Sequence, residues 1–185
     1  QGKNILDLNK TIRTYTGLIP KMDVPSLINI DYVLKKLDRI ARRVPVDKPW
    51  SIPQAKTWDS ITLEAWVRKH CYTTNCYKVV RAGLETVYAS ELNEVSLLHA
   101  LFYICSGTDL NCLLSIDNGA QQHRIKGGMQ ALSDAIAKPF QDSIRFNHAV
   151  KRVTQQEESV IVEGDGFLFR AKHVIMAIPP VLINH

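Results

Sequence analysis

The sequence contains no apolar run that approaches the roughly 18 residues that a bilayer-spanning helix needs. Its opening residues lack the apolar region of a signal peptide, and an initiator methionine is absent. It also lacks the G-x-S-x-G, P-loop and H-E-x-x-H motifs, which argues against a serine hydrolase, a P-loop nucleotide hydrolase and a zinc protease. The missing initiator methionine and the abrupt end of the chain after Pro179-Pro180 predict a segment cut from a longer protein.

Metal-ligand patterns are missing as well. The four cysteines include no C-x-x-C pair, and the six histidines show no metal-ligand spacing, so no zinc site is expected. We interpret the cysteines as reduced, mostly buried thiols of a cytoplasmic protein. They are Cys71, Cys76, Cys105 and Cys112.

The charge balance is basic, with 23 Lys and Arg against 18 Asp and Glu in 185 residues. The densest basic stretch, 35–43, places its charges at three- and four-residue steps opposite the apolar Val33, Leu34, Leu37 and Ile40. This spacing is typical of a helix with one solvated face, and no nucleic-acid motif accompanies it. We therefore expect no nucleic-acid partner. A composition of 45% apolar and 22% charged residues indicates a globular chain.

Hydrophobic periodicity predicts a mainly helical part of the chain followed by a part rich in strands. Short strands are expected over 5–8 and 11–15, around Asn9-Lys10. Helices are expected over 26–43, 62–70, 74–88 and 94–106, with Thr62 as a cap and Gly107 as a terminator. Gly127-Gly128, which favours positive φ or close backbone approach, precedes a short helix over 129–140.

The last third of the sequence is rich in strand-forming residues separated by turns. Strands are expected over 143–146, 149–154, 159–163, 167–170 and 173–178. The predicted fold class is therefore α+β, with a helical first two-thirds that includes a short sheet, followed by a β-rich segment.

Several motifs in order give the chain a family likeness. The stretch 118–128, NGAQQHRIKGG, joins a polar turn, a short strand and a double glycine at a helix start. It follows DKPW at 47–50, WDSIT at 58–62, Cys71 and ELNEVS at 91–96, and HVIMAIPP follows at 173–180. From 47 to 180 the chain resembles the flavin-containing monoamine oxidases, the flavin amine oxidase family. Before residue 47 the match is mainly one of pattern.

This resemblance implies two partial domains and an activity. Residues 1–125 would belong to a substrate-binding domain, and 126–185 to the middle segment of an FAD-binding domain. The parent protein would oxidise an amine to an imine with FAD, which dioxygen reoxidises. The family's G-x-G-x-x-G turn and its flavin-attachment cysteine are not in this sequence, so the 185 residues alone are expected to be inactive and to retain no FAD.

The resemblance also implies binding positions, but no catalytic residue. An apolar cavity with few polar groups would suit a neutral amine. Gly83 replaces a bulkier residue of the vertebrate enzymes, so the identity of the amine does not carry over. The substrate-binding positions implied are Gly83, Thr86, Val87, Leu113, Leu114 and Gln121. The cofactor-binding positions implied are Val150, Ala177, Ile178 and Pro179, mainly through their backbone.

Other interpretations stay open at this point. The expected partners are a small amine and the missing N- and C-terminal parts of the same chain, and a homodimer is an open alternative to a monomer. A non-catalytic helical interaction module built on 74–106 is the rival from another class. Within the oxidoreductases, an amino-acid oxidase, a polyamine oxidase or a carotenoid desaturase-like enzyme would share the architecture.

Overall fold

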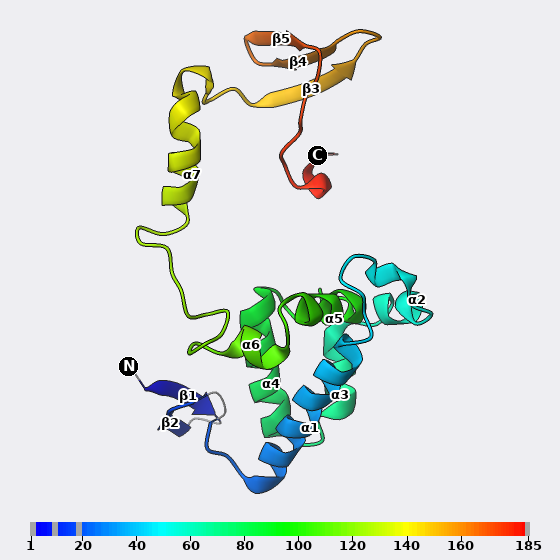
Figure 1. The fold of residues 1–185 in the computed structure, drawn as a ribbon, viewed down its shortest axis with the longest axis vertical. Coiled ribbons are helices and arrows are strands. Elements are labelled where there is room, and N and C mark those ends of the chain that lie inside the picture. Colours follow the sequence, from blue (N-terminus) through cyan, green and yellow to red (C-terminus); the bar gives the residue numbers. More distant parts are fainter. Residues whose placement is uncertain (1–2, 9–10, 18–19, 184–185) are drawn as a thin grey trace. The chain divides into compact units, whose positions relative to one another are not determined.

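The computed structural model describes residues 3–8, 11–17 and 20–183, and the chain divides into two compact units (Figure 1). The first unit comprises Gln1–Arg124 and the second comprises Ile125–His185. The first holds most of the helices, and the second holds a short helix and a small sheet. The broad α+β expectation is met. No helix in the described ranges is both long and apolar enough to cross a bilayer.

A two-stranded hairpin opens the first unit. Strand β1 (Asn4–Leu8) pairs antiparallel with β2 (Thr11–Tyr15), with Asn4 opposite Tyr15. Both strands occur as predicted, whereas the expected turn at Asn9-Lys10 lies outside the described residues. Ile5 and Ile12 are each 72% exposed, so this hairpin adds little to the core.

Helix α1 (Val24–Ala41) begins two residues before its predicted start. Asp23 explains the difference, because its carboxylate accepts the Ser26 amide hydrogen at 2.9 Å and Pro25 fits the first turn of a helix. The predicted apolar face is confirmed, since Val33 and Leu37 are fully buried.

The other predicted helices also occur, and their caps fix their ends. Helix α3 (Leu63–His70) is capped by Thr62, as expected, and α4 (Thr74–Tyr88) has the predicted bounds. Helix α5 (Leu97–Ser106) starts three residues late because Ser96 is its N-cap, and it ends at Gly107 as predicted. Sequence periodicity missed three short elements: η1 (Pro49–Ser51), α2 (Ala55–Asp59) and α6 (Leu110–Leu114).

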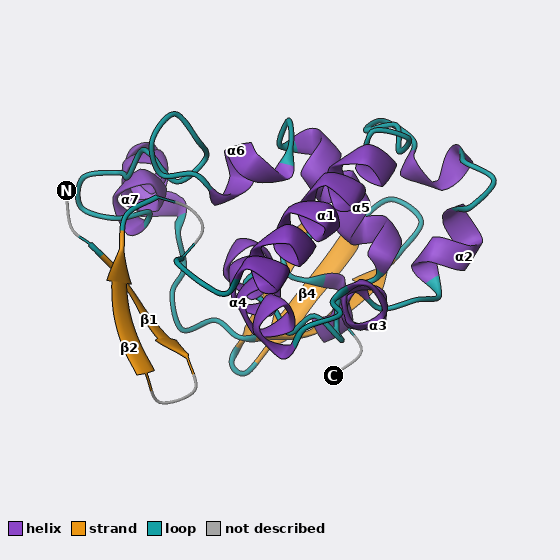
Figure 2. Ribbon diagram, turned by 90° about the horizontal axis from the view of Figure 1, so that it is seen from below, coloured by secondary structure: helices purple, strands orange, loops and turns teal. Residues whose placement is uncertain are grey.

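The core of the first unit lies where α1 packs against α4 and against α5; α1 and α5 lie side by side in Figure 2. The starts of α3 and α5 are joined by backbone hydrogen bonds from Leu63 to Val95 and from Leu97 to Ile61, each 2.8 Å long. Burial of apolar surface is the main stabilising term in such a helical unit. The largest fully buried side chains are Ile30, Leu37, Leu63, Leu84, Leu92, Leu97, Leu101, Ile104 and Leu110.

The cysteine expectation needs one correction. All four cysteines are free, as expected, but only Cys76 is buried, and the other three are half-buried. Cys71 is the C-cap of α3, and Cys105 lies in the last turn of α5.

The second unit contains α7 (Gln130–Ala137), the 3₁₀ helix η2 (Lys138–Ser143) and a three-stranded antiparallel sheet. Its strands are β3 (Val150–Gln155), β4 (Val160–Gly164) and β5 (Phe167–Ala171), followed by η3 (Pro180–Leu182). Gly127 and Gly128 have φ of 86° and 82°, the left-handed conformation that glycine tolerates. The helix predicted over 129–140 is found as a shorter α helix followed by a 3₁₀ turn, in which Pro139 supplies no backbone N–H.

Two predicted strands in this unit are wrong. Residues 143–146 end η2 and enter a turn at Asn147, whose φ is 59°, so extended pairing stops there. Residues 173–178 are irregular, and Ile175 is 92% exposed. Strand propensity alone does not form a strand, because each extended segment needs a ladder partner for its backbone groups.

Candidate functional site

Helix α4 carries three of the predicted substrate-binding positions. Thr73 caps it by accepting the Cys76 amide hydrogen at 3.1 Å. Gly83, Thr86 and Val87 then share one side of the helix, because three- and four-residue steps bring side chains together. Gly83 and Val87 are half-buried, whereas Thr86 is exposed and its hydroxyl donates to the Ala82 carbonyl at 2.8 Å.

Helix α6 presents Leu113 and Leu114 beside α4. A Cβ added to Gly83 would lie 3.6 Å from Cδ2 of Leu114, so the Leu114 side chain contacts this face. Leu113 turns the other way, is 7% exposed and packs over Gly107 in the core. The structure therefore brings Gly83 and Leu114 together and leaves Leu113 as a core residue behind them.

The loop after α6 folds back on it. The Ala120 amide donates to the Cys112 carbonyl at 2.8 Å, and the Gln121 amide donates to the Ser115 carbonyl at 3.2 Å. The Gln121 side chain is exposed, and its Nε2 donates to the Leu113 carbonyl at 3.2 Å. Gln121 is thus held against α6, where it adds a polar group next to the Leu114 surface.

A carboxylate that sequence reasoning missed positions α6. Oδ1 of Asp38, on α1, accepts the Leu110 amide hydrogen at 2.9 Å, and Asp109 caps the same helix through Cys112 at 2.7 Å. Burial raises the pKa of the Asp38 carboxyl, and the nearby Asp109 charge adds to this effect. The two partners are 72 positions apart in the chain, and an isolated Asp within an amphipathic helix gives no signal of this role.

A second missed residue orders the segment that precedes α4. Asn29 is buried; its Nδ2 donates to the His70 carbonyl at 2.9 Å, and its Oδ1 accepts from the Tyr72 amide at 2.6 Å. The Thr73 amide also donates to Oδ1, at 3.3 Å. This one side chain fixes the connection between α3 and α4, and so the start of the helix that carries Gly83.

The predicted cofactor positions all lie in the second unit. Val150 is the first residue of β3, stands opposite Gly164 and is 55% exposed, with a bulge between it and Arg152. Gly164 is required there, because a Cβ would collide with the Ala149 carbonyl and the Phe167 ring. This bulge leaves Val150 at an open end of the sheet.

The remaining cofactor positions, Ala177, Ile178 and Pro179, form the exposed turn that leads into η3. The amides of Ala177 and Ile178 make no backbone hydrogen bond within the described part of the chain, so their polar groups are free to contact a ligand. Val174 and Met176 line a concavity of about 510 Å³ with Val153 and Gln155, so this segment runs beside β3.

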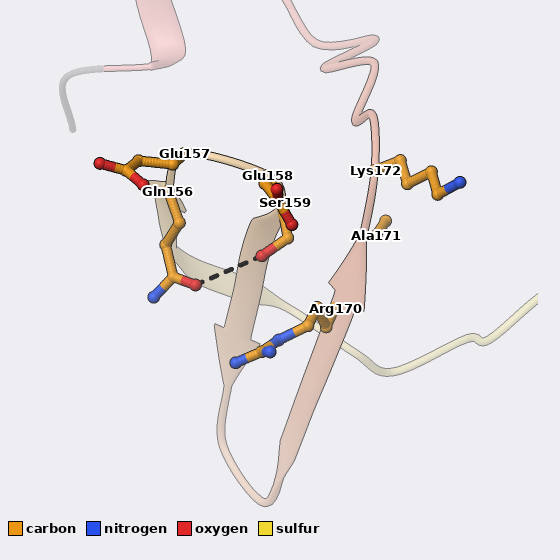
Figure 3. Close-up of a pocket in the computed structure, with 7 residues that line it drawn as sticks. All are labelled: Gln156, Glu157, Glu158, Ser159, Arg170, Ala171 and Lys172. Atoms are coloured by element: carbon orange, nitrogen blue, oxygen red, sulfur yellow. Dashed lines mark hydrogen bonds between the residues drawn. The ribbon is translucent and has the colours of Figure 1, made fainter.

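A second concavity, of about 660 Å³, lies at the turn between β3 and β4 (Figure 3). Gln156 and Ser159 are joined across it by a 3.3 Å hydrogen bond, and Arg170 and Lys172 lie on the neighbouring strand side. None of the predicted site residues lines this hollow. It is an open, charged surface of a hairpin, so we do not assign it to the candidate site. In the described ranges no group of three or more His, Cys, Asp or Glu could hold a metal ion.

Comparison with known proteins adds independent findings. Residues 6–184 match the family described as flavin containing amine oxidoreductase. A flavin-containing monoamine oxidase, AofH, of Mycobacterium tuberculosis is 34% identical over 179 residues, which are 97% of this chain and 39% of that protein. The human amine oxidase [flavin-containing] B is 32% identical over 151 residues, 80% of this chain and 29% of that protein.

Solved structures give the same fold. The cyclohexylamine oxidase of Brevibacterium oxydans matches with a TM-score of 0.84 at 24% identity, over 97% of this chain and 40% of that one. A putrescine oxidase bound to putrescine matches with a TM-score of 0.81 at 22% identity, over 99% and 41%. The chain thus spans about two-fifths of the length of the proteins it resembles.

Proposed function

The chain belongs to the flavin-containing amine oxidoreductase family, and on that premise we propose that the whole protein oxidises an amine with bound FAD. The observation that carries this proposal is the family match, which runs through residues 6–184 and therefore through both units. When bound, FAD would take a hydride from the carbon beside the amine nitrogen, and dioxygen would reoxidise it with release of hydrogen peroxide.

In this proposal the first unit, as part of a substrate-binding domain (1–125), orients the amine. Gly83 and Leu114 supply an apolar surface, Val87 and Thr86 extend it along α4, and Gln121 provides the polar group beside it. Such a surface favours a neutral amine, because an ammonium ion loses hydration there without gaining a counter-charge. Leu113 supports this surface from the core side.

The second unit, as part of an FAD-binding domain (126–185), would hold the dinucleotide through its backbone. Support comes from the exposed start of β3 at Val150 and from the amides of Ala177 and Ile178, which donate no backbone hydrogen bond among the residues that the structure describes. Backbone contacts of this kind tolerate side-chain variation. Neither unit contributes a catalytic residue, since the flavin supplies the redox chemistry and the protein orients its substrate.

An amine without a carboxylate fits the charges on α4 better than an amino acid does. Arg81 is the arginine on this helix, and its guanidinium already contacts Glu85 at 2.6 Å and Glu91 at 2.5 Å. A substrate carboxylate would have to displace these partners. The free cysteines support a reducing, cytoplasmic compartment. A homodimer stays a prediction.

The proposal is tested with the protein encoded by the complete gene, purified beside residues 1–185. The complete protein should show the visible absorbance of a stoichiometric flavin. An amine added without oxygen should bleach this absorbance, and oxygen admitted afterwards should restore it and release hydrogen peroxide. Residues 1–185 should carry no flavin after gel filtration. A complete protein that binds flavin and ignores primary, secondary and diamine substrates would contradict the proposed activity.

A further inference from the structure

Two thiols meet at the junction of α3 and α4. Cys71 ends α3, Cys76 lies in the first turn of α4, and their Sγ atoms are 3.3 Å apart. Cys76 is fully buried, whereas Cys71 is half-buried. The hydrogen bonds of Asn29 and Thr73 hold the intervening segment, so the two sulfurs are kept together by the fold.

We propose that Cys71 and Cys76 form an oxidisable dithiol, which hydrogen peroxide converts into a disulfide bond. A disulfide has its sulfurs about 2.05 Å apart, so these two atoms, now 3.3 Å apart, need to approach by about 1.2 Å. Cys105 and Cys112 provide the contrast within the same chain, because no hydrogen bond joins their sulfurs in the described residues.

The reaction balances without another reagent. The sulfur of Cys71, the more accessible thiol, attacks one peroxide oxygen; the O–O bond breaks, an S–O bond forms, and a first water leaves. The sulfur of Cys76 then attacks the sulfenic acid on Cys71, the S–O bond breaks, and a second water carries away both remaining hydrogens. Two thiols lose two electrons in total, and peroxide gains them.

The environment of the pair sets the speed of this reaction. Burial raises the pKa of both thiols, and the neighbouring Cys76 raises that of Cys71 further. The only titratable group that acts on each of these thiols, among the residues that the structure describes, is the other thiol. No charged side chain there shifts the pKa of either sulfur. Because the thiolate is the nucleophile, oxidation should be slow at neutral pH and should accelerate as pH rises.

A disulfide here would link the end of α3 covalently to the helix that carries Gly83 and Thr86. The proposed amine oxidation would release peroxide and could supply the oxidant. The dithiol itself does not depend on that activity, because added peroxide tests it directly.

Trypsin separates the two cysteine pairs for measurement. Cleavage after Lys69 and Lys78 gives a peptide with Cys71 and Cys76, and cleavage after Arg81 and Arg124 gives one with Cys105 and Cys112. Residues 1–185 would be reduced, desalted, treated with peroxide at several pH values, alkylated after denaturation and digested for mass spectrometry. Peptide 70–78 should lose two hydrogens and resist alkylation until it is reduced, while peptide 82–124 stays fully alkylated.

Matched variants make the test specific. Cys112→Ser should leave disulfide formation unchanged. Cys76→Ser should abolish it and leave Cys71 as a sulfenic acid that dimedone traps, with far-UV circular dichroism confirming the fold. The proposal is overturned if peptide 70–78 keeps both thiols while 82–124 oxidises, or if Cys71 proceeds to sulfinic acid while Cys76 stays free. Intermolecular dimers as the main product would overturn it too.

Discussion

The two units of the chain bury their apolar residues very differently. In residues 1–124 the apolar faces of α1, α3, α4 and α5 close on one another around fully buried side chains such as Leu37 and Leu101. In residues 125–185, Val160 is the one buried apolar residue among those described, while Phe146 and Ile175 are 78% and 92% exposed. The first unit therefore carries its own core, whereas the second leaves most of its described apolar side chains exposed.

This contrast bears on which parts of the candidate site are ordered by contacts within their own unit. The first unit can order the Gly83 and Leu114 surface by itself, because Asp38 and Asn29 fix α6 and α4 from within the same unit. Among the described residues of the second unit only Val160 is buried, which fits the proposed place of its sheet in a larger flavin-binding domain. We therefore expect substitutions to have large effects in the first unit and small ones in the second.

The largest difference is expected from matched leucine truncations. Leu101→Ala in α5 removes a fully buried side chain and should lower the free energy of unfolding by about 2–5 kcal/mol. Leu168→Ala in β5 removes a side chain that is 62% exposed and should change it by less than about 0.5 kcal/mol. Urea unfolding followed by far-UV circular dichroism measures both. Equal losses for the two variants would remove the contrast between the units.

Loss of the Asn29 side chain should have the next largest effect. Asn29→Ala leaves the His70 carbonyl and the Tyr72 amide without their partner and should cost about 1–3 kcal/mol. Asn111→Ala, on the exposed face of α6, is the control and should be nearly neutral. The same urea titration applies. If Asn29→Ala is as stable as its control, the connection between α3 and α4 is held by something else.

These two predictions also show what the sequence could reveal. Thr62 caps α3 through the Ala65 amide, three positions away, and Gly107 directly follows α5, so local pattern was enough to place α3 and the end of α5. Asn29 and Asp38 act on backbone more than 40 positions away, which no local pattern records. The strand expected over 173–178 failed because strand propensity is local, whereas a strand also needs a ladder partner, which the described residues do not provide for this segment.

A smaller difference in stability is expected from glycine substitutions at one residue with positive φ in each unit. Ala89 ends α4 with φ of 50°, where a Cβ is strained, so Ala89→Gly should stabilise the first unit by about 0.5–1 kcal/mol. Asn147, with φ of 59° in the second unit, is a residue type that tolerates this conformation, so Asn147→Gly should gain less. Thermal unfolding distinguishes them. A lower melting temperature for Ala89→Gly would show that Ala89 makes favourable contacts instead.

The smallest expected effect is a pH dependence from His70. This ring is buried against Trp66, with centroids 4.0 Å apart, and burial lowers its pKa below the ordinary histidine value of 6.5. The unfolded chain then binds a proton more readily, so the stability of the first unit should fall as pH decreases below about 6.5. His70→Gln should flatten this slope between pH 7 and pH 5, measured by urea midpoints. An unchanged slope would assign it to other groups.

Hydrogen exchange of residues 1–185, followed by mass spectrometry, tests the central contrast most directly. Amides in α1, α4 and α5 should exchange most slowly, because opening them exposes the shared core, while those of α7 and β3–β5 should exchange rapidly and at similar rates. Slow exchange confined to the first unit is the predicted result. Protection in β3–β5 equal to that in α5 would contradict the account, since it would show that the second unit is stable without further chain.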